Sequence, residues 1–234
     1  MDSITPLDGG PDATELIAYL HASAEKTRAY FSRELHGELG GLLVAVALDI
    51  AFVEQALPHD DQLRQRLARA RSTLAAAIDL KRKTVEALRP SILDNFGLFE
   101  AIKWEVKNES ARARLPCSES YPNVEPKFTP DAAIALFRIA QESLGVALRH
   151  PSVKTVRVAL DIDTATVRIG VSHDGEASNQ MPATDDLFAI CSIAYRAYAL
   201  GGRMKVTRVP GGGAQYSTTL PLARLTEIPK IIGV

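Results

Sequence analysis

The sequence is poor in cysteine, in net charge and in long apolar runs, and each shortage excludes a class of protein. Its two cysteines, Cys117 and Cys191, could pair, but without C-x-x-C spacing they favour two buried free thiols over a metal site or disulfide framework. The net charge of −1 gives no general attraction to nucleic acid or to an anionic membrane. No run approaches about 18 apolar residues, and the N-terminus lacks a basic and an apolar region, so we expect a cytoplasmic protein without a membrane-spanning segment.

What the sequence does contain is a long helical pattern in its first 90 residues. A helix is predicted from residue 12 or 14 to about 57, because apolar residues recur every three or four positions. These residues are Leu35, Leu39, Leu42, Val46, Ile50, Val53 and Leu57. The turn "PHDD" at 58–61 separates it from a second helix, which carries Leu63, Leu67, Ala70, Leu74, Ala77, Val85 and Leu88 and ends before Pro90. After a leader at 1–13, residues 14–90 therefore predict an antiparallel helical hairpin.

A hairpin has two apolar stripes and cannot enclose a core by itself. The simplest way to bury both stripes is to pair two copies into a four-helix bundle, which predicts a homodimer. The alternative is that the hairpin packs on the C-terminal part of its own chain.

The C-terminal part, residues 91–225, has a different pattern and is followed by a tail at 226–234. Helices are predicted at about 98–110, 131–149 and 186–200, with a proline-containing link at 116–130. Strands are predicted at 155–162, 166–173, 204–209 and 215–222, the last two joined by a turn at "PGGG", residues 210–213. The fold class is therefore α+β, with helices on one face of a mostly antiparallel sheet.

Four segments in this order resemble the transmitter of a two-component sensor histidine kinase. They are "RELHGELG" (33–40), "LRPSILDNFGL" (88–98), "LFRIAQESL" (136–144) with "LRH" (148–150), and "ALGG" with "VPGGGAQYSTTLP" (199–221). The most similar subfamily has a phosphoacceptor box that reads roughly R-E-L-H-D-x-L-G-Q. The resemblance implies that the hairpin is a dimerisation and histidine-phosphotransfer domain. It also implies that the C-terminal part is a GHKL (Bergerat-type) α/β sandwich, as in gyrase-type ATPases.

The resemblance implies that His36 is the phosphoacceptor. His36 follows Leu35 of the apolar stripe and so lies about 100° from it on the helix, where an imidazole is exposed and can act as a nucleophile toward a phosphoryl group. The alternative is an ordinary surface histidine, since the chain has four others, His21, His59, His150 and His173.

Several positions depart from the family pattern around the histidine and around the metal. The acidic residue after the phosphoacceptor is replaced by Gly37, and the glutamine five residues after it is replaced by Gly41. In the nucleotide domain Glu142 is retained, but the asparagine that holds Mg²⁺ is replaced by Val146. An isopropyl group cannot ligate a hard cation that prefers oxygen.

The adenine box, D-x-G-x-G in the family, reads "HDGEA" here. His173 stands at the aspartate position and Ala177 at the last glycine, while Gly175 fits the middle glycine. A slip of one residue would bring Asp174 to the aspartate position. The resemblance implies that this box has lost its adenine acceptor.

The glycine-rich lid also departs from the pattern. It reads "LFAICSI" at 187–193, and Leu187, Ala189 and Ser192 replace its three glycines, so the segment extends an apolar helix. Together these losses predict that no nucleotide, metal or other cofactor is bound, and that a partner receiver domain supplies any Mg²⁺.

The sequence therefore predicts a histidine phosphotransferase that passes phosphoryl groups between response-regulator aspartates through His36 without using ATP. Gly37, Gly40 and Gly41 would give a receiver domain close access beside Arg33, although relaxed selection also explains the glycines. The expected partners are receiver domains, a hybrid sensor kinase and a second copy of the chain. Two alternatives remain: a non-catalytic pseudo-histidine-kinase that modulates a partner, and an active ATP-dependent sensor histidine kinase. With no sensor domain expected before residue 28, signals would come from partners.

Overall fold

The computed structural model describes residues 13–56, 61–176, 184–209 and 212–226. Within it the chain divides into two compact units, Met1–Ser91 and Ile92–Val234. The first unit is helical and the second combines helices with a mixed sheet, so the chain is α+β.

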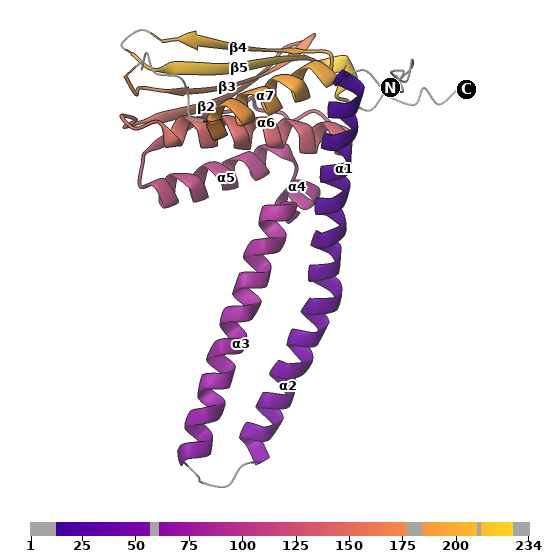
Figure 1. The fold of residues 1–234 in the computed structure, drawn as a ribbon, viewed down its shortest axis with the longest axis vertical. Helices are drawn as coiled ribbons and strands as arrows, with labels where there is room; N and C mark the ends of the chain where they lie inside the picture. The colour runs from indigo at the N-terminus through magenta and orange to yellow at the C-terminus, as the bar shows by residue number, and fades with distance from the viewer. Residues whose placement is uncertain (1–12, 57–60, 177–183, 210–211, 227–234) are drawn as a thin grey trace, which may run out of the picture. The chain divides into compact units, whose positions relative to one another are not determined.

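The N-terminal unit contains α1 (Ala13–Glu34), a π-helical segment η1 (Leu35–Leu39), α2 (Gly40–Ala56) and α3 (Asp61–Leu88). The first three run on as one helix, and both α1 and α2 contact α3 (Figure 1). The apolar spacing predicts one uninterrupted α-helix, and this prediction is wrong at η1, where the backbone is π-helical. The short π-helical segment lies where the glycines begin, because glycine tolerates a local change of backbone geometry.

The apolar residues of α2 remain in contact with solvent in the single chain. None of its side chains is buried, and Leu42, Leu48 and Phe52 are 66%, 66% and 73% exposed. The helical stretch Tyr19–Ala56 has a mean hydropathy of 1.7 and could cross a membrane by its length and composition alone. Core helices of other proteins and signal sequences also meet these two criteria. The expectation of no membrane-spanning segment therefore stays a prediction.

The C-terminal unit is built on a five-stranded sheet with the order β1-β2-β3-β5-β4. Its strands are β1 (Cys117–Ser120), β2 (Val156–Ile162), β3 (Thr166–His173), β4 (Arg203–Arg208) and β5 (Ala214–Pro221). β1 pairs in parallel with β2, and the other pairs are antiparallel. β1 lies in the stretch expected to be a link, so the sheet gains an edge strand.

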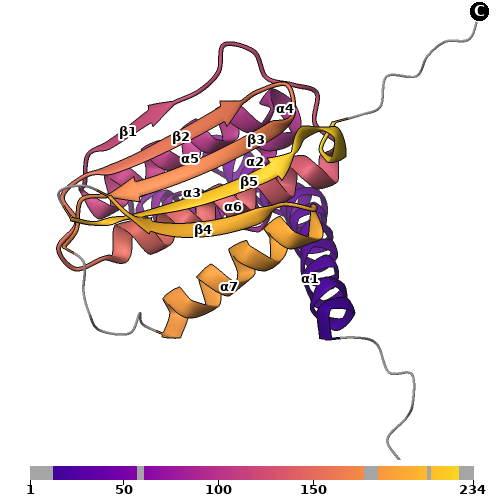
Figure 2. The same cartoon turned by 90° about the horizontal axis from the view of Figure 1, so that it is seen from above.

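Helices cover one face of this sheet (Figures 1 and 2). They are α5 (Leu98–Ala113), α6 (Pro130–Arg149) and α7 (Thr184–Ala199), with the short α4 (Ser91–Phe96) before them. Alternate residues of β2 and β3, such as Val158 and Ile169, are buried together with Phe137 of α6 in one core. Trp104 on α5, the sole tryptophan of the chain, is 36% exposed.

Two local features begin the helices of this unit. Thr129 caps α6 by accepting a hydrogen bond from the Ala132 amide at 3.3 Å. The Glu125 carboxylate accepts from the Leu98 and Phe99 amides at 2.7 and 2.8 Å, which satisfies the first donors of α5.

The two cysteines are free, as predicted, but they are not both buried. Cys117 is half-buried in β1, and Cys191 is exposed on α7.

Candidate functional site

The predicted phosphoacceptor lies within the π-helical segment of the N-terminal unit. His36 is exposed there, and so are Arg33, one turn before it, and Gly37, directly after it. A Cβ atom added at Gly37 or Gly41 would meet no atom within 4 Å in the part of the chain described. Single π-helical turns often occur at functional sites. The imidazole is therefore accessible from the side of both glycines.

Gly40 has a different surrounding from its two neighbours. A Cβ there would lie 3.0 Å from the Lys81 Nζ atom, which reaches across from α3. The missing side chain at Gly40 therefore makes room for a cationic side chain one helical turn from His36. This ammonium group places positive charge close to the residue expected to carry a phosphoryl group.

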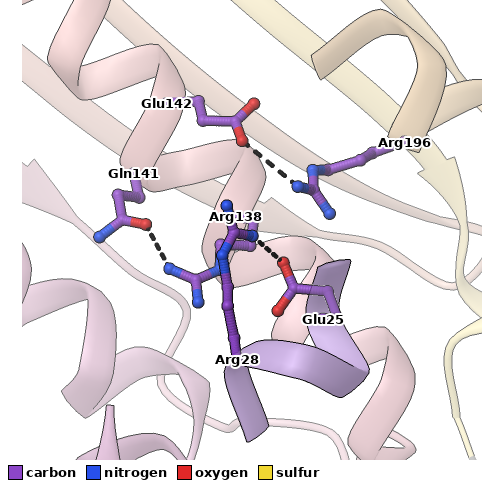
Figure 3. Close-up of polar contacts among 6 residues, drawn as sticks. All are labelled: Glu25, Arg28, Arg138, Gln141, Glu142 and Arg196. Atoms are coloured by element: carbon purple, nitrogen blue, oxygen red, sulfur yellow. Dashed lines mark hydrogen bonds and ion pairs between the residues drawn. The ribbon is translucent and has the colours of Figure 1, made fainter. Parts of the chain in front are cut away.

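In the C-terminal unit, the retained family glutamate is engaged by an arginine. Glu142 on α6 contacts Arg196 on α7, with 3.4 Å between Oε1 and Nη2 (Figure 3). Its Oε2 atom is buried and accepts no hydrogen bond within the described residues. The position of the family's metal-binding asparagine, Val146, is 4% exposed and belongs to the apolar core. This pair of positions presents one oxygen-bearing side chain where the family pattern has two.

Other polar groups on the same helix are also paired. Arg138 of α6 donates to Gln141 Oε1 at 2.7 Å, and Gln141 donates to Glu105 of α5 at 2.9 Å. Burial raises the pKa of Glu105. In the N-terminal unit, Arg28 pairs with Glu25 one turn earlier in α1 (Figure 3).

His173, at the adenine-aspartate position, is packed among aromatic rings at the end of β3. It is 4% exposed, its ring centre lies 4.6 Å from that of His150, and Tyr216 stacks at 6.1 Å. Its Nδ1 atom accepts a hydrogen bond from the Gly175 amide at 3.1 Å. Burial, and then the charge of His150, lower the pKa of His173, so the neutral imidazole is favoured.

Asp174, the alternative adenine acceptor, is occupied within the fold. Its carboxylate accepts hydrogen bonds from the Lys154 amide, the Thr155 amide and the Thr155 hydroxyl, at 2.8 to 2.9 Å. The backbone donors lower the pKa of Asp174 to about 2. A Cβ at Gly175 would lie 2.4 Å from Nδ1 of His150, so glycine is required by that close approach. Asp174 therefore fixes the backbone of the two residues that precede β2.

The segment at the family's lid position is helical, as predicted. Leu187, Ala189 and Ser192 lie inside α7. Asp186 in its first turn accepts two hydrogen bonds from Arg149 of α6, at 2.9 and 2.7 Å. Ala177 lies outside the described residues.

These side chains do not fit a magnesium nucleotide held in the family's manner. Val146 offers no ligand to a cation, His173 is buried, and the Asp174 carboxylate already has its donors. No group of three or more His, Cys, Asp or Glu that could hold a metal is found among the described residues.

Comparison with known proteins gives one family match and several curated relatives. Residues 27–93 match the family model for histidine kinase. The chain is 26% identical over 196 residues to the sensor histidine kinase LiaS of Bacillus subtilis (strain 168). The aligned region covers 83% of this chain and 54% of LiaS. It is 22% identical over 201 residues to the signal transduction histidine-protein kinase/phosphatase DegS of Brevibacillus brevis. Here the aligned region covers 85% of this chain and 52% of DegS.

Solved structures also match the chain at a low level of similarity. The histidine kinase domain from the Erythrobacter litoralis EL346 blue-light activated histidine kinase matches with a TM-score of 0.47 and 17% identity, covering 79% of this chain and 95% of that chain.

The sequence matches support a histidine kinase transmitter acting in two-component signal transduction. The matched residues 27–93 include His36 and most of the N-terminal unit. The chain spans about half the length of LiaS and DegS.

The prediction of a phosphotransferase that works between response regulators without ATP is wrong. The relatives are named sensor histidine kinases and kinase/phosphatases, which favours a kinase. The error came from treating changed nucleotide contacts as evidence for a different reaction. Such contacts bear on how a nucleotide is held, and they carry no information on the direction of phosphoryl flow.

Proposed function

We propose that this chain acts as the transmitter of a two-component sensor histidine kinase, with His36 as the residue that is phosphorylated from ATP and then passes the phosphoryl group to a response regulator. Because Val146 is in the core and Asp174 is already hydrogen bonded, the nucleotide would have to be held by contacts that differ from the family pattern. One observation carries the proposal: an exposed imidazole within a π-helical turn, open on the side of Gly37 and Gly41, inside the stretch that matches the histidine kinase model. The proposed cellular location is the cytoplasm, where ATP and response regulators are found.

The proposal includes dimerisation through an antiparallel helical hairpin. The exposed apolar side chains of α2, among them Leu42, Leu48 and Phe52, need a covering surface, and a second copy supplies one of the same length and character. A four-helix bundle of two hairpins would bury both stripes.

The proposed partners are response-regulator receiver domains, with a hybrid sensor kinase as a further candidate. A receiver would approach His36 over Arg33, Gly37, Gly40 and Gly41, and it would bring its own acidic, magnesium-binding pocket. Lys81 beside Gly40 supports this surface, because an ammonium group there offsets the charge of the incoming phosphoryl group.

A second candidate function is a non-catalytic transmitter that binds and modulates a partner kinase or regulator. The specific observation behind it is the set of side chains at the nucleotide positions, where Val146 is in the core and Asp174 is already hydrogen bonded. In this candidate the nucleotide site is degenerate, and His36 has no chemical role.

Labelling with radioactive ATP separates the two candidates. The chain is incubated with γ-labelled ATP and Mg²⁺, and the kinase proposal expects label that is acid-labile and base-stable. His36→Gln should abolish the label, while His21→Gln, the same change elsewhere in the same unit, should retain it. Absence of label on the unaltered chain, together with no heat of nucleotide binding at millimolar ATP, would leave the non-catalytic candidate.

A further inference from the structure

The strand at one edge of the C-terminal sheet carries unpaired positive charge. β4 pairs only with β5 in the described part of the chain, so its other edge has free backbone donors and acceptors. Arg203, Lys205 and Arg208 are exposed on this strand and form no ion pair with any described residue. The edge is therefore positive and open to hydrogen bonding.

A further positive charge lies at the start of this edge. Gly201, in the turn before β4, has a φ of +75°, and a Cβ there would lie 2.5 Å from Nη1 of Arg224. The positive φ favours glycine at this turn, and the Arg224 guanidinium lies against it.

The helix that contacts the edge strand, α7, has an exposed apolar face. Phe188, Cys191, Tyr195 and Tyr198 are spaced by three, four and three residues, which puts them on one side of a helix. Phe188 is 70% exposed and Tyr198 is 67% exposed. α7 contacts β4, and the two lie side by side in Figure 2.

The lengths of the strand and the helix face correspond. Six residues of β4 extend about 20 Å, and the ten steps from Phe188 to Tyr198 rise about 15 Å along α7. The chain reverses between them at Leu200–Gly202, so the two run antiparallel. An extended segment laid along β4 would therefore match the length of this face of α7.

The apolar face is also held in place. Arg149 binds Asp186 in the first turn of α7, and Glu142 pairs with Arg196 in its last turns. Because both ends of α7 are fixed to α6, the surface is formed before a partner arrives, which lowers the entropy cost of binding.

We propose that the free edge of β4 and the outer face of α7 bind an acidic, amphipathic segment of a partner protein, which adds as a further strand to the sheet. Backbone hydrogen bonds to β4 would provide affinity. Acidic side chains on one face of the added strand would face Arg203 and Lys205, and apolar ones on its other face would contact Phe188, Tyr198 and Val206. Two β4 edges carry the same charge and repel each other, so the surface selects a partner over a second copy. This inference is independent of the proposed function at His36.

The test uses a fluorescein-labelled peptide, Glu-Val-Glu-Leu-Asp-Val-Glu-Leu, titrated with the full chain and followed by anisotropy. Two control peptides are titrated in the same way. One has lysine at every acidic position, and the other has the backbone amides that would face β4 methylated, so that they cannot donate hydrogen bonds to the strand. We expect saturable binding of the acidic peptide and at least about tenfold weaker binding of both controls.

Variants locate the peptide on the surface. Arg203→Glu with Lys205→Glu should weaken binding at least about tenfold, and Phe188→Ser should weaken it several-fold. Arg157→Glu with Arg168→Glu makes the same charge change on β2 and β3 and should change binding less than about twofold. The bound peptide should also protect the Cys191 thiol from alkylation, with half-buried Cys117 as the internal reference.

Three results would overturn the inference. They are no saturable binding of the acidic peptide, equal binding of the methylated peptide, or an equal loss in the β2–β3 variant. The last two would indicate a diffuse attraction between charges with no strand addition.

Discussion

In the C-terminal unit, alternate residues of β2 and β3 are buried beneath helices, whereas in the N-terminal unit the apolar residues of α2 stay in contact with solvent. Phe137 of α6 is fully buried, and Phe52 of α2 is 73% exposed. Both units are rich in apolar residues, so composition does not explain the difference. A sheet with a helical layer has two surfaces that cover each other, and a pair of helices has no second layer. The C-terminal unit therefore carries its own core, whereas the apolar residues of α2 in the N-terminal unit are left exposed in the single chain.

The largest expected effect is a truncation in the C-terminal core. Phe137→Ala should lower the free energy of unfolding by about 3–5 kcal/mol, because it removes a buried ring and leaves a cavity. Phe52→Ala, at a protein concentration where the chain is monomeric, should cost less than about 0.5 kcal/mol. Urea unfolding followed by circular dichroism measures both. Similar losses for the two variants would mean that the N-terminal unit has a core of its own.

A charge in the exposed stripe of α2 tests the need for a second copy. Leu42→Glu should weaken dimerisation by at least about 100-fold, because an unpaired carboxylate would be buried between two hairpins. Gln65→Glu places the same charge at an exposed polar position of α3 and should leave the dimer intact. Sedimentation equilibrium reads both. A monomer in the unaltered chain at micromolar concentration would contradict the bundle.

The buried imidazole of the C-terminal unit should make that unit sensitive to mild acid. The pKa of His173 is lowered in the fold, so below about pH 6.5 the unfolded chain binds a proton that the folded chain does not, and stability falls as the pH falls. The slope is at most about 1.4 kcal/mol per pH unit for one group.

His173→Asn tests the assignment of this slope. An amide oxygen can still accept the Gly175 N–H bond, but it does not titrate. Unfolding between pH 7.5 and 5.5 should show a smaller slope for the variant, whatever its absolute stability. His150 faces the same ring, with Asp174 and Tyr216 also close, so His150→Asn is the companion measurement. An unchanged slope for His173→Asn would show that another group titrates.

The smallest expected effect separates the glycines next to His36. Gly41→Ala should stabilise the helix by up to about 1 kcal/mol, since its Cβ would meet nothing within 4 Å. Gly40→Ala should gain less, because the Lys81 ammonium must move away. Thermal unfolding of the two variants gives the difference. An equal gain would mean that Lys81 does not lie against Gly40.

The elements with strong periodicity were predictable from the sequence. The predicted strands at 155–162 and 166–173 agree with β2 and β3 within one residue, and the helix predicted at 131–149 is α6. β1 was missed because "CSES" has no alternation of apolar and polar residues, and its pairing with β2 comes from tertiary contacts. The six residues of α4 are too few to show a helical period.

The site was predictable only in part. Local motifs indicated His36 and the substitutions at Val146 and His173. The stacking of His173 on His150 depends on residues 23 positions apart, and the pairing of Glu142 with Arg196 spans 54, so neither follows from a local pattern. The π-helical turn was missed because glycine content alone does not distinguish a widened turn from a regular helix.

The single tryptophan makes fluorescence a probe of the C-terminal unit alone. Trp104 lies on α5, 36% exposed at the surface of the C-terminal unit, and no other tryptophan occurs in the chain. Its emission follows the unfolding of that unit alone, whereas the far-ultraviolet ellipticity sums both units and is weighted toward the long helices. In a single denaturant titration, two midpoints from the two signals would show that the halves melt separately, and one shared midpoint would show that they melt together.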